Sequence, residues 1–119
     1  MAPKPLKPQR SDCPIASTLD IVGDKWTLLL IRDIGLFDKH RNKDFQEADE
    51  GIPSNILANR LKLLVEHGLL EKRLYEERPP RYEYHLTKAG EGLLPVVRAM
   101  ARWGADNIRG VEIPDSVKR

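Results

Sequence analysis

The spacing of the apolar residues changes at Gly68, and this change limits the folds that the chain can adopt. Before Gly68, three leucines recur at helical spacing and predict a helix that opens at Pro53–Ser54 and runs to about residue 67. After Gly68, apolar and charged residues alternate over 70–74 and again over 82–86, as in two strands. The segment EERPP between them predicts a turn at Pro79–Pro80. We therefore expect a helix followed directly by an antiparallel hairpin.

Four further helices are expected around this unit. CPIASTLDIVG predicts a helix with Pro14 in its first turn. Asp24 is expected to cap the next helix, DKWTLLLIRDIGLF, which is apolar on nearly all sides and should be the central buried one. A short helix is expected at 43–49, and a long last helix follows Thr87 with a kink or restart at Pro95. The order predicts a mainly α fold with a small antiparallel β-wing (α+β), a winged helix-turn-helix.

The chain has 119 residues, the size of one compact domain. Residues 1–12 are rich in Pro and Lys and lack periodicity, so we expect a flexible arm there, the winged domain over 13–109 and a flexible tail over 110–119. The chain has one cysteine, no apolar run that could span a membrane and no hydrophobic signal core. These features lead us to expect a cytoplasmic protein with no membrane partner.

The helix that precedes Gly68 has an unusual polar face. Opposite its leucines lie short side chains that carry little charge but donate and accept hydrogen bonds: Ser54, Asn55, Ala58, Asn59 and Lys62, with Arg60 between two apolar sets. Asn can pair with adenine through two hydrogen bonds, Lys reaches guanine or phosphate, and Ala allows close approach to a thymine methyl. The pattern favours a helix that enters the major groove of double-stranded DNA. The residues expected to contact the DNA are Ser54, Asn55, Ala58, Asn59, Arg60 and Lys62. The alternative is the ordinary polar surface of a half-buried helix.

The hairpin adds weight to the DNA interpretation. Arg78 and Arg81 flank its stiff Pro-Pro tip, an arrangement that suits insertion near a narrow minor groove. In the alternative, Glu76 and Glu77 balance these arginines in an ordinary charged hairpin. The net charge of +2 and the pI of about 8.8 point only weakly to nucleic acid. A winged-helix module that binds protein without specific DNA binding is the second hypothesis for the whole chain.

Several motifs, taken together and in order, carry a family resemblance: CPI at Cys13, GDKWTLLLIRD from Gly23, GIPSNILANRLKLL from Gly51, HGLLEKR from His67, PPRYEYHLTKAG from Pro79, and LLPVV from Leu93 with Trp103 after it. In this combination the chain resembles the HxlR-type family of bacterial winged helix-turn-helix transcription regulators. It departs from that family at Asn42, where an aromatic residue often stands, and at Pro53, which precedes the serine of the recognition helix.

The resemblance implies a homodimer, built largely by the N- and C-terminal helices, that binds a palindromic operator. Two-fold pairing places two recognition helices about 34 Å apart along the duplex. The apolar face of the last helix is longer than one small domain easily covers, and the residues expected in the dimer interface are Ile15, Leu19, Leu94, Val97, Met100, Ala101 and Trp103. The alternative is that this face packs onto the helix that holds Trp26.

Cys13 precedes Pro14 at an expected helix N-terminus, where the helix dipole favours a nucleophilic thiolate. Some HxlR-type regulators resemble redox or electrophile sensors with a cysteine in this position, so Cys13 is a candidate sensor. Because the chain has no second cysteine, a disulfide would have to join two subunits or a small thiol. The alternative is a small apolar residue at the dimer edge. A small-molecule effector is compatible with the sequence, which does not identify one.

Other chemistry is not indicated. His40, His67 and His85 are widely separated and match no metal-ligand spacing. The sequence has neither a glycine-rich phosphate loop nor a set of residues typical of a catalytic site. We therefore expect no enzyme activity, no cofactor and no metal.

Overall fold

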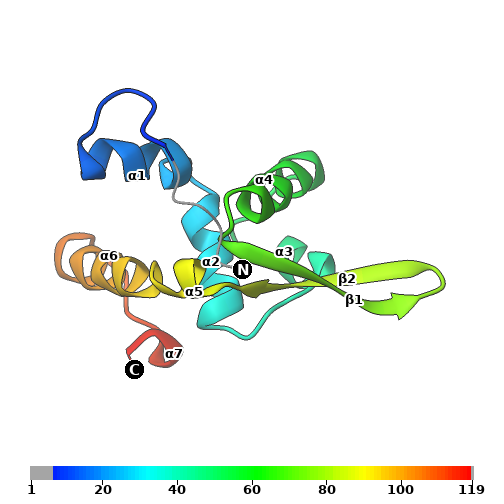
Figure 1. The fold of residues 1–119 in the computed structure, drawn as a ribbon. Helices are drawn as coiled ribbons and strands as arrows, with labels where there is room; N and C mark the ends of the chain where they lie inside the picture. Colours follow the sequence, from blue (N-terminus) through cyan, green and yellow to red (C-terminus); the bar gives the residue numbers. More distant parts are fainter. Residues whose placement is uncertain (1–6, 119) are drawn as a thin grey trace.

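The computed structural model describes residues 7–118, and within them the chain forms seven helices and one two-stranded antiparallel sheet. Helix α2 lies at the centre, the hairpin projects to one side, and α1 and α6 lie at the opposite end (Figure 1). This is the predicted fold class, a mainly helical winged helix-turn-helix. The elements are α1 (Pro14–Val22), α2 (Thr27–Gly35), α3 (Asn42–Gln46), α4 (Ser54–Glu66), β1 (Leu70–Glu77), β2 (Pro80–Leu86), α5 (Lys88–Glu91), α6 (Leu94–Asn107) and α7 (Asp115–Lys118).

The carboxylate of Asp24 organises the start of the central helix. It accepts hydrogen bonds from the backbone N–H groups of Trp26 and Thr27 and from the Thr27 hydroxyl. Asp24 therefore does bind N–H groups at the helix start, but it is not the N-cap residue that the sequence predicted: α2 begins at Thr27 and its N-cap is Trp26, because residues 24–26 form a turn. Helix α1 likewise begins with Pro14 in its first turn, as predicted.

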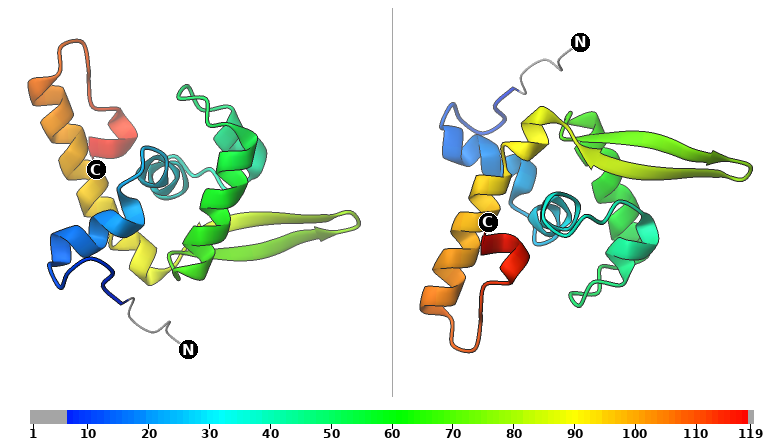
Figure 2. Two further views of the ribbon diagram at one scale, coloured as in Figure 1. Left: turned by 90° about the horizontal axis from the view of Figure 1, so that it is seen from above. Right: turned by 90° about the horizontal axis from the view of Figure 1, so that it is seen from below.

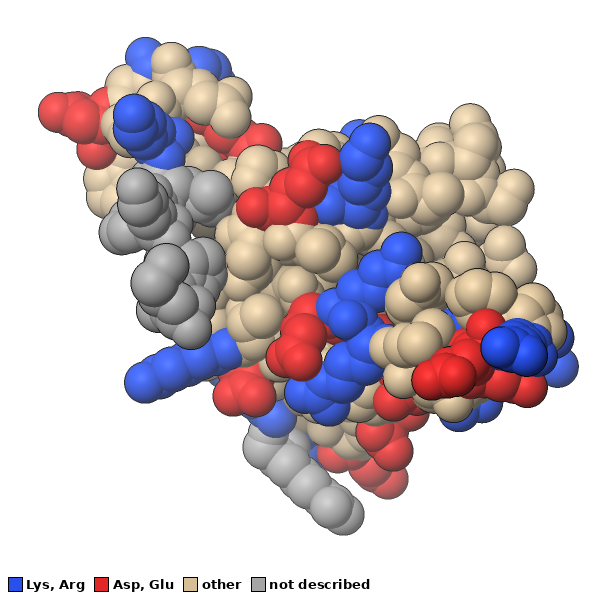
Figure 3. Space-filling model, turned by 45° about the vertical axis from the view of Figure 1, so that its right-hand side comes forward, with Lys and Arg blue, Asp and Glu red and all other residues tan. Residues whose placement is uncertain are grey.

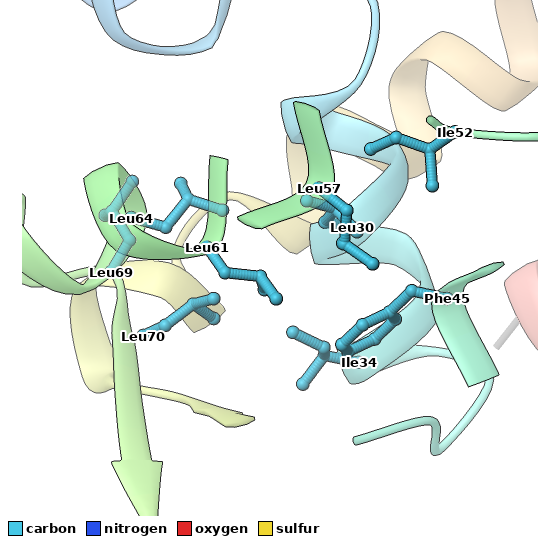
Figure 4. Close-up of a cluster of buried hydrophobic side chains, with 9 residues drawn as sticks. All are labelled: Leu30, Ile34, Phe45, Ile52, Leu57, Leu61, Leu64, Leu69 and Leu70. Atoms are coloured by element: carbon cyan, nitrogen blue, oxygen red, sulfur yellow. The ribbon is translucent and has the colours of Figure 1, made fainter. Parts of the chain in front are cut away.

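One apolar cluster joins α2, α3, α4 and the root of the hairpin (Figure 4). Phe45 is fully buried in it and anchors α3, which is shorter than the predicted 43–49 because the chain turns after Gln46. Burying each such side chain contributes roughly 1.5–3 kcal/mol. The cluster consists of Leu30, Ile34, Phe45, Ile52, Leu57, Leu61, Leu64, Leu69 and Leu70.

The hairpin leaves the domain soon after it starts. Leu70 pairs with Leu86 and is the only buried residue of β1. Farther out, Leu74 pairs with Tyr82, and both are about half exposed. Both views of Figure 2 show the two strands extending as an isolated wing. The alternation therefore predicted the strands correctly, although it marks a buried face only at their root.

The last helix restarts at the predicted place. The Thr87 hydroxyl accepts a hydrogen bond from the N–H of Gly90 and so caps the short helix α5. That helix ends at Gly92, and α6 starts with Pro95 in its first turn. A proline is tolerated there because the N–H groups of the first helical turn have no hydrogen-bond acceptor within the helix, so the missing N–H of proline costs no hydrogen bond. The chain therefore starts a new helix at Leu94, and α5 and α6 are not one kinked helix.

The described parts of the predicted arm and tail contact helices of the domain. Of the predicted arm, residues 1–6 lie outside the described residues, while in the remainder the Arg10 guanidinium pairs with Asp20 of α1 at 2.6 Å. The predicted tail contains α7, and its Val117 is only 5% exposed because it packs near Val97 of α6. The structure therefore places residues up to 118 on the domain rather than apart from it.

Replacing Leu61 by Ala is expected to destabilise the fold by about 2–5 kcal/mol, since this side chain is 2% exposed and its loss leaves a cavity between α4 and α2. Urea unfolding followed by circular dichroism measures the change. The matched control is Lys62→Ala on the exposed face of the same helix, which should shift stability by less than about 0.5 kcal/mol. Equal effects of the two substitutions would contradict the packing described here.

Candidate nucleic-acid interface

Helix α4 presents one polar strip to solvent. Because Leu57, Leu61 and Leu64 face the core, the residues on the opposite side are turned outward, and all five of them are exposed: Ser54, Asn55, Ala58, Asn59 and Lys62. Within residues 7–118 none of these side chains is engaged in a hydrogen bond or an ion pair. The strip is thus a set of free donors and acceptors on a rigid helix, with an alanine that allows close approach.

The amino end of α4 is also open. Pro53 precedes the helix in an extended conformation, and no side chain caps the first turn. The first turn contains no acidic residue. The N–H groups at a helix start attract anions such as phosphate. The open end and the polar strip therefore lie on one continuous surface that suits a polyanion.

Arg60 differs from the other predicted residues of this helix. Its Nε lies 3.5 Å from the Asp24 carboxylate, and its side chain is 30% exposed. The pair connects the middle of α4 to the turn that starts α2. Arg60 is therefore engaged in holding the helix in place, and we do not include it in the surface strip.

The wing carries its arginines at and near the tip. Arg78 and Arg81 are both exposed, and the Arg78–Pro79 peptide bond is cis. The Arg81 guanidinium lies 3.2 Å from the Glu76 carboxylate across the hairpin, so one of the acidic residues does balance one arginine. An exposed pair of this kind is weak and can be exchanged for a phosphate. The predicted wing residues are thus accessible to a ligand.

A hollow between α3 and the wing adds residues that the sequence did not identify as a site. It has a volume of about 560 Å³, and its lining includes Arg41, Lys43, Arg81 and Tyr82. The Arg41 guanidinium lies 3.9 Å from the ring centre of Tyr75, which occupies the irregularity in strand pairing between residues 74 and 76. A bulge re-aims a side chain, and simple alternation does not reveal it. Three cations and aromatic rings therefore line one concave surface beside α4.

The charges of this side of the molecule are mixed. In Figure 3 blue Lys and Arg side chains alternate with red Asp and Glu side chains, and no single basic patch covers the face. This distribution agrees with the small net charge of +2. Long-range attraction of a polyanion to this face would be correspondingly modest, so binding would depend on contacts at short range.

Residues 7–118 bring together no group of three His, Cys, Asp or Glu side chains that could hold a metal ion. None of the helices in this range combines the length and the apolar character that crossing a membrane requires.

Comparison with known proteins places the chain in a family. The model of the HxlR-like helix-turn-helix family matches residues 21–112, most of the chain. The chain belongs to the HxlR-like helix-turn-helix family. Among its relatives, the uncharacterized HTH-type transcriptional regulator YybR of Bacillus subtilis is 33% identical over 104 residues, which cover 87% of this chain and 82% of that protein. The relatives are transcriptional regulators rather than enzymes, in agreement with the sequence analysis.

Two solved structures of regulators resemble this HxlR-like chain closely. The redox regulator HypR in its reduced form superposes with a TM-score of 0.72 at 33% identity, and the match covers 82% of this chain and 95% of that one. The reduced form of the transcriptional regulator YodB from Bacillus subtilis gives a TM-score of 0.64 at 30% identity and covers 83% and 97% of the two chains.

The HxlR-like chain also exposes apolar side chains at the end that lies opposite the wing (Figure 1). Ile15 and Leu19 of α1 and Met100 and Trp103 of α6 are between 53% and 72% exposed. The other predicted interface residues are less accessible, because Val97 is buried within the chain and two are half-buried: Leu94 and Ala101. Cys13, at the start of α1, is exposed beside this surface.

The role of Asp24 leads to a pH-dependent prediction. Burial alone raises the pKa of Asp24, but hydrogen bonds from Thr27 and Trp26 and the charge of Arg60 outweigh it and lower the pKa below its ordinary value. The carboxylate therefore stabilises the fold above the unfolded-state pKa of about 3.9, and this contribution is lost as the pH falls through the lower folded-state pKa. Asp24→Asn should cost about 1 kcal/mol at pH 7 and progressively less below about pH 4.

Urea unfolding at several pH values tests this prediction. Asp49→Asn is the control, because Asp49 is exposed and has no ion-pair partner within residues 7–118. A stability difference between Asp24→Asn and the wild type that stays constant from pH 7 to pH 2 would show that the charge of Asp24 does not matter.

Proposed function

We propose that this chain is a sequence-specific DNA-binding transcription regulator that acts as a homodimer on a palindromic operator. The observation that carries the proposal is the exposed, unpaired polar strip of α4, formed by Ser54, Asn55, Ala58, Asn59 and Lys62. Membership of a helix-turn-helix family of regulators supports it independently.

In this proposal α4 enters the major groove. Asn55 and Asn59 are one helical turn apart and can each form two hydrogen bonds with an adenine, while Ala58 between them allows the backbone to approach the bases. Lys62, one turn farther along, reaches guanine or phosphate. Side chains on a helix are held more rigidly than those on a loop, which suits discrimination between base edges.

The wing and α3 contact the DNA backbone on either side of α4. Arg78 and Arg81 lie at the tip and suit a neighbouring minor groove. Arg41 and Lys43 face the hollow beside the wing and would neutralise phosphates. Phosphate contacts of this kind position the protein without reading the sequence, so the strip and the wing have different roles.

The exposed apolar residues of α1 and α6 support the homodimer. Helices α1 and α6 lie away from the wing, so pairing through their exposed residues Ile15, Leu19, Met100 and Trp103 leaves both recognition helices free. Large apolar side chains gathered on one side of a soluble domain mark an interaction surface. Val97 is not assigned to this interface because its side chain already packs inside the chain.

Cys13 is proposed as a redox-sensitive residue. It is exposed next to the proposed dimer surface, and a similar protein is described as a redox regulator. In the proposed step the Cys13 thiols of two subunits form one disulfide, and an oxidant such as diamide takes up both hydrogens and is reduced to the hydrazine. The bond changes the angle between the two DNA-binding heads.

The first prediction for this function concerns the recognition strip. Asn55→Ala and Asn59→Ala should each weaken specific binding by about 1–3 kcal/mol, because each removes a two-point contact with a base. Fluorescence anisotropy with DNA from upstream of the protein's own gene, and with a scrambled duplex, gives both affinities. Each variant should lose affinity for the specific duplex only.

Arg81 provides the contrast in the same assay. Arg81→Ala should weaken binding to both duplexes equally and lower the salt slope by about one, because it removes one phosphate contact. Glu76→Gln frees Arg81 from its ion pair and should shift affinity in the opposite direction. If the asparagine and arginine variants all bind as the wild type does, the interface is assigned to the wrong surface. Wild-type protein that binds neither duplex even at low salt would favour the protein-interaction module.

A second prediction concerns the subunit interface. Leu19→Glu places a charge on the exposed apolar surface and should convert the dimer to a monomer of 13.6 kDa, since burying an unpaired carboxylate is costly. Sedimentation velocity measures the mass. Glu47→Gln, an exposed change near α3, serves as the control and should leave the dimer intact. A wild-type protein that sediments as a monomer at micromolar concentration would refute the dimer.

A third prediction concerns Cys13. Diamide should lower the affinity of the wild type for its DNA and produce a dimer in non-reducing electrophoresis, while Cys13→Ser should keep its affinity. Dithiothreitol should reverse the effect in the wild type. The sensor assignment is wrong if the serine variant loses DNA to the same degree.

A further inference from the structure

A second hollow lies at the root of the wing, apart from the surface proposed to bind DNA. It has a volume of about 540 Å³ and is formed where the end of α2, the end of β2 and the start of α6 meet. Figure 2 shows these three elements gathered around the base of the wing. Its apolar lining consists of Ile34, Gly35, Leu86, Leu94 and Pro95, and its titratable lining of His40, Arg73, His85, Glu91 and Arg98.

Gly35 allows the apolar side chains to converge. A Cβ atom at this position would lie 2.6 Å from the Leu94 side chain and 2.8 Å from that of Leu86. Leucines from α6 and from the wing root therefore lie directly over the end of α2. The result is an apolar surface shared by a helix of the proposed dimer interface and by the wing.

Arg98 is the distinctive polar group of the hollow. Its Nε is shielded from solvent, yet within residues 7–118 that atom has no hydrogen-bond acceptor and the guanidinium has no ion-pair partner. Because the Nε is shielded, an occupant of the hollow would contact the terminal nitrogens of the guanidinium. The fork of a guanidinium matches a carboxylate through two parallel hydrogen bonds.

The other basic groups of the hollow are engaged with partners, which leaves Arg98 as its free cation within residues 7–118. The rings of His40 and His85 stack with their centres 4.2 Å apart. Burial lowers the pKa of His40, but hydrogen bonds to Asp38 and to the Tyr84 carbonyl outweigh it and raise the pKa. Arg73 adds a charge at the edge while it pairs with Glu71 at 3.1 Å. Glu91 is the one carboxylate in the lining, and it is exposed.

We propose that this hollow binds a small organic carboxylate, with the carboxylate on Arg98 and the apolar body on Ile34, Leu86 and Leu94. The lining is half apolar and half titratable, which suits a ligand that has an apolar body and a charged group. An inorganic anion would leave the apolar part unused, and a neutral ligand would leave Arg98 without a partner. Because α6 and β2 both line the hollow, an occupant also adjusts the wing relative to the dimer, an effect that rests on the proposed function.

The experiment uses benzoate as the probe and the full chain as the protein. Amide chemical shifts recorded during a titration give the dissociation constant. Benzamide, a neutral molecule of nearly the same shape, and inorganic phosphate, an anion without an apolar body, should each bind at least about tenfold more weakly, since each lacks one of the two proposed contacts. Arg98→Gln should weaken benzoate about tenfold, while Arg102→Ala, an exposed arginine one turn along α6, should have no effect.

Several results would overturn the site. They are equal binding of benzoate and benzamide by the wild type, binding of phosphate as tight as that of benzoate, and unchanged benzoate affinity in folded Arg98→Gln. The first two comparisons use only wild-type protein and stand even if the variant does not fold. In a parallel DNA titration, benzoate should change the affinity of the wild type but not that of Arg98→Gln. Benzoate binding that depends on Arg98, in a protein that binds no DNA, would preserve the site and reject the proposed function.

Discussion

The burial of a single side of α4 determines what the rest of the molecule presents to its surroundings. Leu57, Leu61 and Leu64 are each at most 2% exposed, so the helix cannot rotate about its axis without removing leucines from the core. The outward strip is fixed as the complement of that packing. Because the same leucines contact α2, α3 and the root of β1, the core also fixes how far the strip lies from the wing.

A polar contact refines this arrangement. Asp24 holds the first N–H groups of α2 and at the same time pairs with Arg60 on α4. Its carboxylate therefore links the start of α2 with the middle of α4. An ion pair fixes the position of one helix along the other more closely than an apolar contact does. The surface proposed to read DNA is therefore held in place both by apolar packing and by the Asp24–Arg60 ion pair.

Local patterns predicted the helices and the hairpin well, because each leucine of α4 and each cap or breaker acts within a few residues of its own position. Long-range partners were harder to predict. Arg60 was assigned to the DNA surface because the sequence does not reveal Asp24, thirty-six positions earlier, as its partner. The tail shows no periodicity, yet Val117 is buried because α6 leaves an apolar groove beside it. The contact of Tyr75 with Arg41 could not be predicted from alternation, because the pairing of the strands is irregular at that point.

The buried contacts of the wing lie at its root. Leu70 is its sole buried residue on β1, and the N–H of Tyr84 donates to the carbonyl of His40 in the loop before α3. A strand rises about 3.3 Å per residue, so the eight residues of β1 make a lever roughly 25 Å long, and a rotation of about 10° at the root moves the tip by about 4 Å. A displacement of that size is comparable with the rise of one base pair, about 3.4 Å. Mechanically, then, the hairpin would amplify at its tip a change in packing at the root that is too small to disturb the core.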